Sequence, residues 1–71
     1  MADETYLYTL YWAPEGKPIA TVRATDGWRA RKLAPQPYRK AIGEIYSVRH
    51  DQMPADEFAS LQRRGFGQET K

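Results

Sequence analysis

The sequence contains no cysteine and a single histidine, His50. The absence of cysteine excludes disulfide bonds, thiolate metal ligands and a thiol nucleophile. One imidazole cannot by itself form a site that needs two. His50 is followed by Asp51, and no second histidine or cysteine could complete a metal site around them, so we interpret the two as a solvated pair at a strand end. We therefore expect no metal site and no cofactor.

Long apolar runs are also missing. No stretch approaches the roughly 18–20 apolar residues that span a bilayer. The first five residues, MADET, lack the basic start and the apolar stretch of a secretory signal. The absence of cysteine is typical of a reducing compartment. These features predict a cytoplasmic protein that does not associate with membranes, and its small size favours a bacterial or phage source.

The sequence does contain enough apolar residues for one small core. Its 71 residues are 41% hydrophobic and include two Trp, five Tyr and two Phe. A domain of this size buries only about 60% of the surface that its unfolded chain exposes, which leaves little room for an enclosed catalytic pocket. We predict a single domain over residues 1–66 and a flexible C-terminal tail over residues 67–71.

The formal net charge of +2 conceals an uneven distribution. Residues 1–22 have a net charge of −2 and residues 50–71 a net charge of −1. Residues 23–49 carry seven basic and two acidic side chains, which is a local charge of +5. A basic middle segment of this kind can attract phosphate groups or an acidic protein surface.

Three segments have the residue types of β-strands. Residues 5–12 are aromatic and β-branched, which predicts a first strand. A turn over residues 13–18, with two prolines and a glycine, leads into a second strand over residues 19–24. Residues 44–49 form the third predicted strand. The first two strands are therefore expected to form a hairpin.

Two segments have the pattern of short helices. Residues 28–34 have a small apolar stripe and end before a proline, and residues 35–43 are expected to be an extended loop. The second helix is predicted over residues 54–64, with acidic side chains in its first turn and arginines in its last. Gly65 follows at the position where a left-handed residue ends a helix, and Phe66 is expected to pack back on the helix.

This order of elements predicts an α+β fold, β-β-α-β-α, with a three-stranded antiparallel sheet. The first strand should lie at the centre, in the order 2-1-3. We expect both helices to pack on one face of the sheet and the other face to be open to solvent. The covered face should contain Tyr8, Leu10, Trp12, Val22, Tyr46 and Val48.

Two surfaces are candidates for binding a partner. The first is the open sheet face, where Tyr and Arg, which are enriched at protein interfaces, accompany apolar side chains. Its predicted residues are Leu7, Tyr11, Arg23, Ile45 and Arg49. The second is a basic patch with interleaved aromatic residues, a combination that binds nucleic acids through phosphates and stacked bases. It consists of Trp28, Arg29, Arg31, Lys32, Tyr38, Arg39 and Lys40.

No pair of residues has the spacing of catalytic groups. Ser47 and His50 lie three positions apart on an alternating strand, so they should point to opposite faces. Asp56 and Glu57 are adjacent in the first turn of a helix, where they complement its dipole. We therefore do not expect an enzyme.

The leading functional hypothesis is a small, non-enzymatic binding protein that docks on a larger macromolecule. A protein partner is the first expectation, as for a phage or mobile-element regulator or inhibitor. The alternative is a nucleic-acid-binding protein that uses the basic patch. A structural homodimer is the second alternative. Whether the sheet face is an interface, and whether the patch binds phosphate or is a solvated helix face, stays open at this point.

Overall fold

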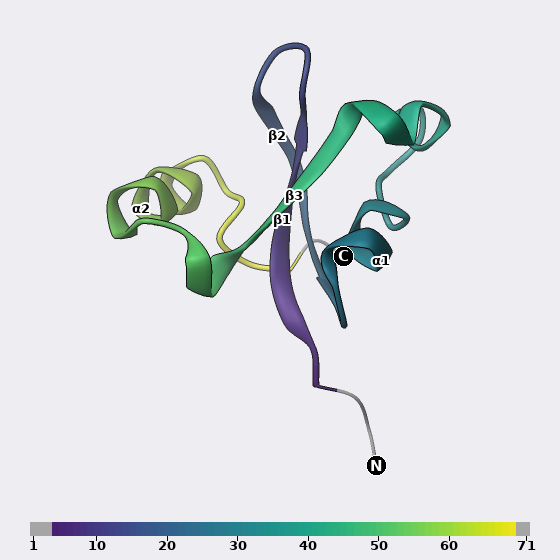
Figure 1. The fold of residues 1–71 in the computed structure, drawn as a ribbon. Coiled ribbons are helices and arrows are strands. Elements are labelled where there is room, and N and C mark those ends of the chain that lie inside the picture. Colours follow the sequence, from purple (N-terminus) through teal and green to yellow (C-terminus); the bar gives the residue numbers. More distant parts are fainter. Residues whose placement is uncertain (1–3, 70–71) are drawn as a thin grey trace.

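The structure, a computed structural model, describes residues 4–69 as a three-stranded antiparallel sheet with helices on both sides (Figure 1). The strand order is β2-β1-β3, which confirms the predicted α+β fold and its central first strand. Within residues 4–69 no helix has the length and apolarity needed to cross a membrane. The elements are β1 (Tyr6–Trp12), β2 (Lys17–Ala24), α1 (Gly27–Arg31), the 3-10 helix η1 (Tyr38–Glu44), β3 (Ile45–Arg49), the 3-10 turn η2 (His50–Gln52) and α2 (Ala55–Arg63).

The hairpin of β1 and β2 closes at Gly16, which has a φ of +63° that favours glycine. Its register is regular from Tyr6 to Leu10 and then shifts, because Leu10 pairs with Ala20 whereas Tyr11 pairs with Pro18. Ile19 is the extra residue of this β-bulge. Pro18, which has no N–H to donate, lies on a strand at the edge of the sheet, where the missing donor is tolerated.

The two helices cover opposite faces of the sheet, so the prediction that both pack on one face is wrong. Tyr8 and Leu10 of β1 form one buried cluster with Ala30 of α1. Tyr11, on the other face of the same strand, forms a second cluster with Leu61 of α2. Large apolar side chains on both faces of β1 leave neither face able to remain open to water.

Strand β3 is antiparallel to β1 as predicted, but its two faces are exchanged relative to the prediction. Ile45 pairs with Trp12 and is only 2% exposed on the α1 side, whereas Tyr46 pairs with Tyr11 on the α2 side and is 44% exposed. The prediction that grouped Tyr46 and Val48 with Leu10 is therefore wrong. A shift of one residue in register exchanges the two faces of a strand, and the alternation within residues 44–49 is apolar on both faces.

Helix α1 is shorter than the predicted 28–34. Its N-cap is Asp26, whose carboxylate accepts a hydrogen bond from the Arg29 backbone N–H at 2.8 Å. Gly27 permits a close approach to β3, since a Cβ atom there would lie 2.7 Å from the Ser47 Oγ, which donates to the Gly27 carbonyl. The chain leaves the helix after Arg31 in a turn.

Residues 35–43 are not the extended loop that was predicted, because most of them belong to η1. Helix α2 matches its prediction to within one residue at each end. Gly65 has a φ of +88°, and the Phe66 N–H donates to the Leu61 carbonyl at 2.8 Å, as in a Schellman cap. Of the predicted tail, residues 67–69 are described, and residues 70–71 lie outside the described range.

The structure makes Ile45 a core residue and leaves Tyr46 at the surface, and a pair of substitutions tests this. We expect Ile45→Ala to lower the free energy of unfolding by about 2–5 kcal/mol, because it leaves a cavity beside Leu10. Tyr46→Thr should cost only about 1 kcal/mol, chiefly the loss of its stacking on Tyr11. Urea denaturation followed by far-UV circular dichroism measures both, and a larger loss for Tyr46→Thr would contradict the register of β3.

Candidate functional site

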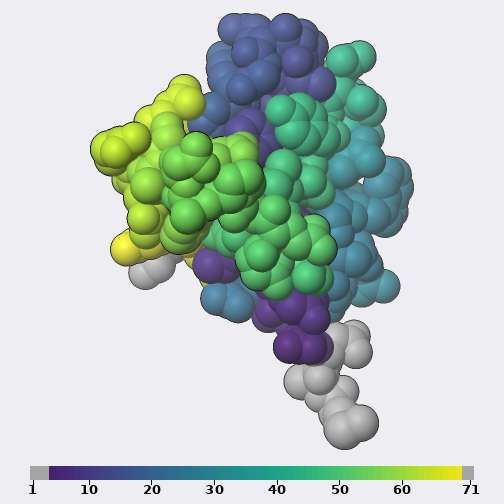
Figure 2. Space-filling view, turned by 60° about the vertical axis from the view of Figure 1, so that its left-hand side comes forward, coloured from purple at the N-terminus to yellow at the C-terminus, as the bar shows by residue number. Residues whose placement is uncertain are grey.

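The five residues predicted to form an open sheet face do not share one surface. Tyr11 is 6% exposed and lies beneath α2, together with Met53 and Leu61. Ile45 is buried on the opposite face, against α1. In Figure 2, α2 and the segment after it cover the face of the strands to which Tyr11 belongs. The prediction of a solvent-exposed sheet face is therefore wrong.

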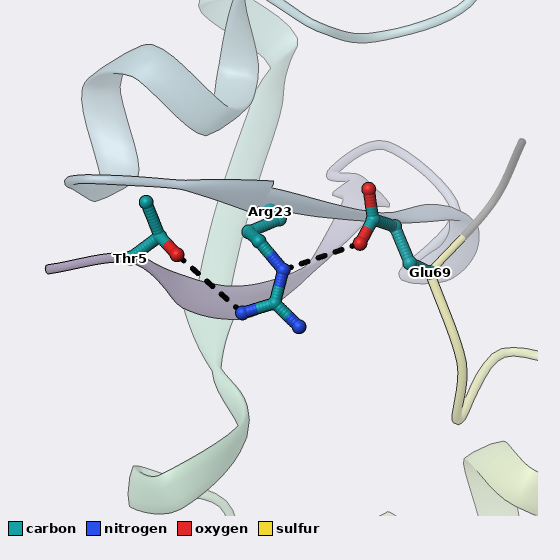
Figure 3. A network of polar contacts seen from close by, with 3 residues as sticks. All are labelled: Thr5, Arg23 and Glu69. Atoms are coloured by element: carbon teal, nitrogen blue, oxygen red, sulfur yellow. Dashed lines mark hydrogen bonds and ion pairs between the residues drawn. The ribbon is translucent and has the colours of Figure 1, made fainter. Parts of the chain in front are cut away.

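The other three predicted residues of that face, Leu7, Arg23 and Arg49, line a shallow depression of about 280 Å³ at the end of the sheet. The Arg23 guanidinium contacts the Glu69 carboxylate at 3.2 Å and the Thr5 hydroxyl at 3.4 Å (Figure 3). Arg49 is paired with Asp51 at 2.5 Å. Carboxylates thus already neutralise both guanidiniums of this depression, so it offers no net attraction to an anion.

The Tyr6 ring borders the same depression. The Arg49 guanidinium lies 4.3 Å from its centroid, in a cation–π arrangement. A hydrogen bond to the Glu4 carboxylate, the largest of several causes, raises the pKa of the Tyr6 hydroxyl. Glu4 therefore adds a third acidic group to this end of the sheet, beside Asp51 and Glu69.

The predicted basic patch is a coherent surface on the α1 side of the sheet. Trp28 is 54% exposed, and both the Arg31 guanidinium and the Lys32 ammonium lie 5.1 Å from its ring centroid. Leu33, directly after these residues, is 50% exposed. An exposed indole between two cations is unusual for a side chain that would be expected to pack on the protein.

Two of the patch arginines fasten α1 to the neighbouring segment. Arg31 Nη2 donates to the Ile42 carbonyl at 2.7 Å, and Arg39 Nε donates to the Ala34 carbonyl at 3.0 Å. These bonds leave the positive charges in place while they hold α1 and η1 as one unit. We call this surface, formed by Trp28, Arg29, Arg31, Lys32, Arg39 and Lys40, the basic–aromatic surface.

The charges on this surface are not equally available. Arg29 lies 3.5 Å from the Asp26 carboxylate, an exposed ion pair that contributes little to stability. Lys32 and Lys40 have no carboxylate within ion-pair distance among residues 4–69. These two lysines are therefore the cations most available to a bound anion.

Tyr38, which the sequence placed in the same patch, has a different environment. Its ring packs against Trp12 at 5.3 Å between centroids and is half-buried beside the α1-side core. The Lys17 ammonium, 6.0 Å from the Tyr38 ring, brings a further cation to this side of the molecule. Lys17 lies outside the basic segment in sequence, so only the fold shows that it belongs here.

His50 is a residue whose environment the sequence did not predict. Its Nε2 lies 2.6 Å from the Thr9 Oγ1, and its ring packs on Phe58 at 5.1 Å, so it is not a solvated neighbour of Asp51. Burial lowers the pKa of His50. The signal in the sequence was Thr9 and Thr21, two threonines at opposed positions that are now fully buried.

The groups that could support catalysis are separated. Ser47 donates its hydroxyl to the Gly27 carbonyl on the α1 side, and His50 bonds to Thr9 on the α2 side. Burial, followed by the nearby Glu57 carboxylate, raises the pKa of Tyr11 to about 12. Within the described part of the chain no group of three His, Asp or Glu side chains could hold a metal ion.

The N-cap of α1 positions the basic–aromatic surface, which can be tested with two variants of one residue. Asp26→Ala should lower the free energy of unfolding by about 1 kcal/mol, because the Arg29 N–H loses its acceptor. Asp26→Asn keeps an acceptor and loses only the exposed ion pair with Arg29, which costs about 0.5 kcal/mol or less. Equal losses in urea denaturation would contradict the capping role.

Comparison of the chain with models of protein families, with curated proteins and with solved structures gave no match. The candidate site therefore rests on its own geometry. That geometry consists of an exposed indole with Arg31 and Lys32 beside it, an Arg31 side chain held by a hydrogen bond to the Ile42 carbonyl, and two lysines without ion-pair partners among residues 4–69.

Proposed function

We propose that this protein is a non-enzymatic binding protein that docks on a nucleic acid through its basic–aromatic surface. The observation that carries the proposal is the environment of Trp28, a half-exposed indole flanked by Arg31 and Lys32. Cations next to an exposed aromatic ring can neutralise phosphates while a base stacks on the ring.

The chemistry of the surface favours a single-stranded nucleic acid over a protein partner. An unpaired base can stack on Trp28, whereas the bases of a duplex are already stacked on one another. The sheet face that would have suited a protein partner is covered by α2. The α1 side of the molecule instead combines the exposed indole with the cations of Arg31 and Lys32 next to it.

Binding of a labelled single strand of about 15 nucleotides tests this proposal. We expect Trp28→Ala to weaken binding by about 1–3 kcal/mol, the typical contribution of one stacked base. Lys32→Ser should reduce the magnitude of the slope of log K against log salt concentration by about 0.7, because one phosphate contact is lost from a single strand. Fluorescence anisotropy at several salt concentrations measures both effects.

The control is a double variant on the other side of the sheet, Arg63→Ser with Arg64→Ser. These two arginines are exposed at the end of α2, and replacing both changes the net charge by two. Helix α2 lies on the other side of the sheet from α1, which contains Trp28 (Figure 1). We expect this variant to bind nearly as tightly as the wild type, because Trp28 and Lys32 are unchanged and only the net charge differs. No binding at low salt, or an equal loss for the Arg63/Arg64 variant, would overturn the proposal, as would equal competition by polyglutamate.

A further inference from the structure

A chain of hydrogen bonds crosses the α2 side of the sheet from His50 to the segment after α2. His50 Nε2 lies 2.6 Å from the Thr9 Oγ1, which lies 3.1 Å from the Thr21 Oγ1. Thr21 in turn donates to the Phe66 backbone carbonyl. The chain therefore connects the end of β3 through β1 and β2 to the residue that follows the cap of α2.

The direction of each bond follows from the last one. A carbonyl oxygen can only accept, so Thr21 uses its single hydroxyl proton on Phe66. The bond between the two threonines must then be donated by Thr9, and Thr9 must accept from an N–H at His50 Nε2. Neutral His50 is therefore the tautomer with its proton on Nε2 and a lone pair on Nδ1.

The Nδ1 atom of His50 is buried and has no hydrogen-bond partner among residues 4–69. The lone pair of a neutral ring is tolerated there. A proton on Nδ1, in contrast, would be a buried N–H without an acceptor, next to the Phe58 ring at 5.1 Å. The surroundings of His50 therefore stabilise the neutral ring relative to the imidazolium ion.

Burial is the cause of the lowered pKa of His50. The charged side chains on the surrounding elements do not contribute to the shift. They are Arg49 and Asp51 beside it in the chain, Arg23 on β2, Asp56 and Glu57 in the first turn of α2, and Glu69 in the last described segment. None of these carboxylates accepts a hydrogen bond from the buried His50 Nδ1.

The elements joined by this chain are held by few other contacts. The α2 side of the core contains three buried apolar residues, Tyr11, Met53 and Leu61, with Phe58 and Phe66 packed against them at partial exposure. Beyond Phe66, Arg23 and Glu69 form an exposed ion pair, which adds little. The polar chain is therefore a substantial part of what fixes α2 and residues 65–69 on the sheet.

We propose that His50, Thr9, Thr21 and Phe66 form a proton-sensitive latch that holds α2 and the segment after it on the sheet. Protonation of His50 opens the latch, and α2 separates from the sheet while the α1 side stays in place. The device is independent of the proposed binding of nucleic acid, since the basic–aromatic surface lies on the other face.

The sign of the pH dependence follows from linkage. Once α2 has opened, His50 is exposed and has its ordinary pKa of about 6.5, whereas the closed form has a lower one. Between these values the open form binds more protons, so acid favours opening and the stabilisation is lost as the pH falls below 6.5. The maximal increase in the opening equilibrium is tenfold for each pH unit by which closure lowers the pKa.

Two NMR measurements on the wild-type protein test the latch. Long-range proton–nitrogen correlation spectra should show His50 with its proton on Nε2 and a titration midpoint below 6.5. Amide exchange, corrected for its intrinsic pH dependence, should accelerate in α2 and at Phe66 as His50 titrates. The increase should match the measured pKa shift, and the amides of α1 should not respond.

The matched control is His50→Gln, whose side-chain amide can still donate to Thr9 but does not titrate between about pH 5 and 7. We expect exchange in α2 of this variant to be independent of pH in that range. The latch is overturned by a proton on Nδ1, by a His50 midpoint at or above 6.5, or by the same pH response in His50→Gln. If the variant does not fold, the wild-type titration alone decides between these outcomes.

Discussion

The central strand β1 is the element on which the rest of the structure depends. It pairs with β2 on one edge and β3 on the other, and its side chains enter both buried clusters. Leu10, fully buried, anchors the α1 side, and Tyr11, the next residue, anchors the α2 side. Because large apolar side chains lie on both faces of β1, each face has to be covered, by α1 on one side and by α2 on the other. Neither face is therefore left open for a partner.

The two faces of β1 have different chemistry, and this separates the two parts of the molecule that could act. On the α1 side the buried side chains include small ones such as Ala30 and Ala34, so a helix of five residues lies close to the sheet and presents its outer side chains to solvent. On the α2 side two buried threonines lie between the apolar residues, and they need hydrogen-bond partners. The exposed outer side chains of α1 can bind an external ligand, whereas the buried threonines on the α2 side take part in a chain of hydrogen bonds inside the protein.

Local features were predictable from the sequence, and the relation between elements was not. The Gly65 cap and α2 follow from residue types within a few positions of each other, and the hairpin follows from its Pro- and Gly-containing turn. The face of β3 depends on a pairing between residues more than thirty positions apart, and its five residues have no strict alternation that would specify the register. Because the faces of β3 were assigned wrongly, Ile45 was predicted to lie on the open sheet face, whereas it is a core residue. The basic–aromatic surface was predictable as a group of residues, because it is contiguous in sequence, but not the backbone bonds that fix Arg31 and Arg39.

The partial burial of His50 illustrates why a polar network is harder to predict than an apolar core. An apolar side chain is stabilised by removal from water almost wherever it lies, so its burial can be inferred from its type. A histidine is buried only where a particular acceptor is in reach, and Thr9 lies forty-one positions away. The acceptor is available because Thr9 bonds to Thr21 across the β1–β2 pair, and that pairing in turn depends on the hairpin register set before the bulge. The position of the His50 ring is thus a consequence of the hairpin register. The same hydrogen bonds link the ring through Thr9 and Thr21 to the Phe66 carbonyl, and so to the segment that follows α2.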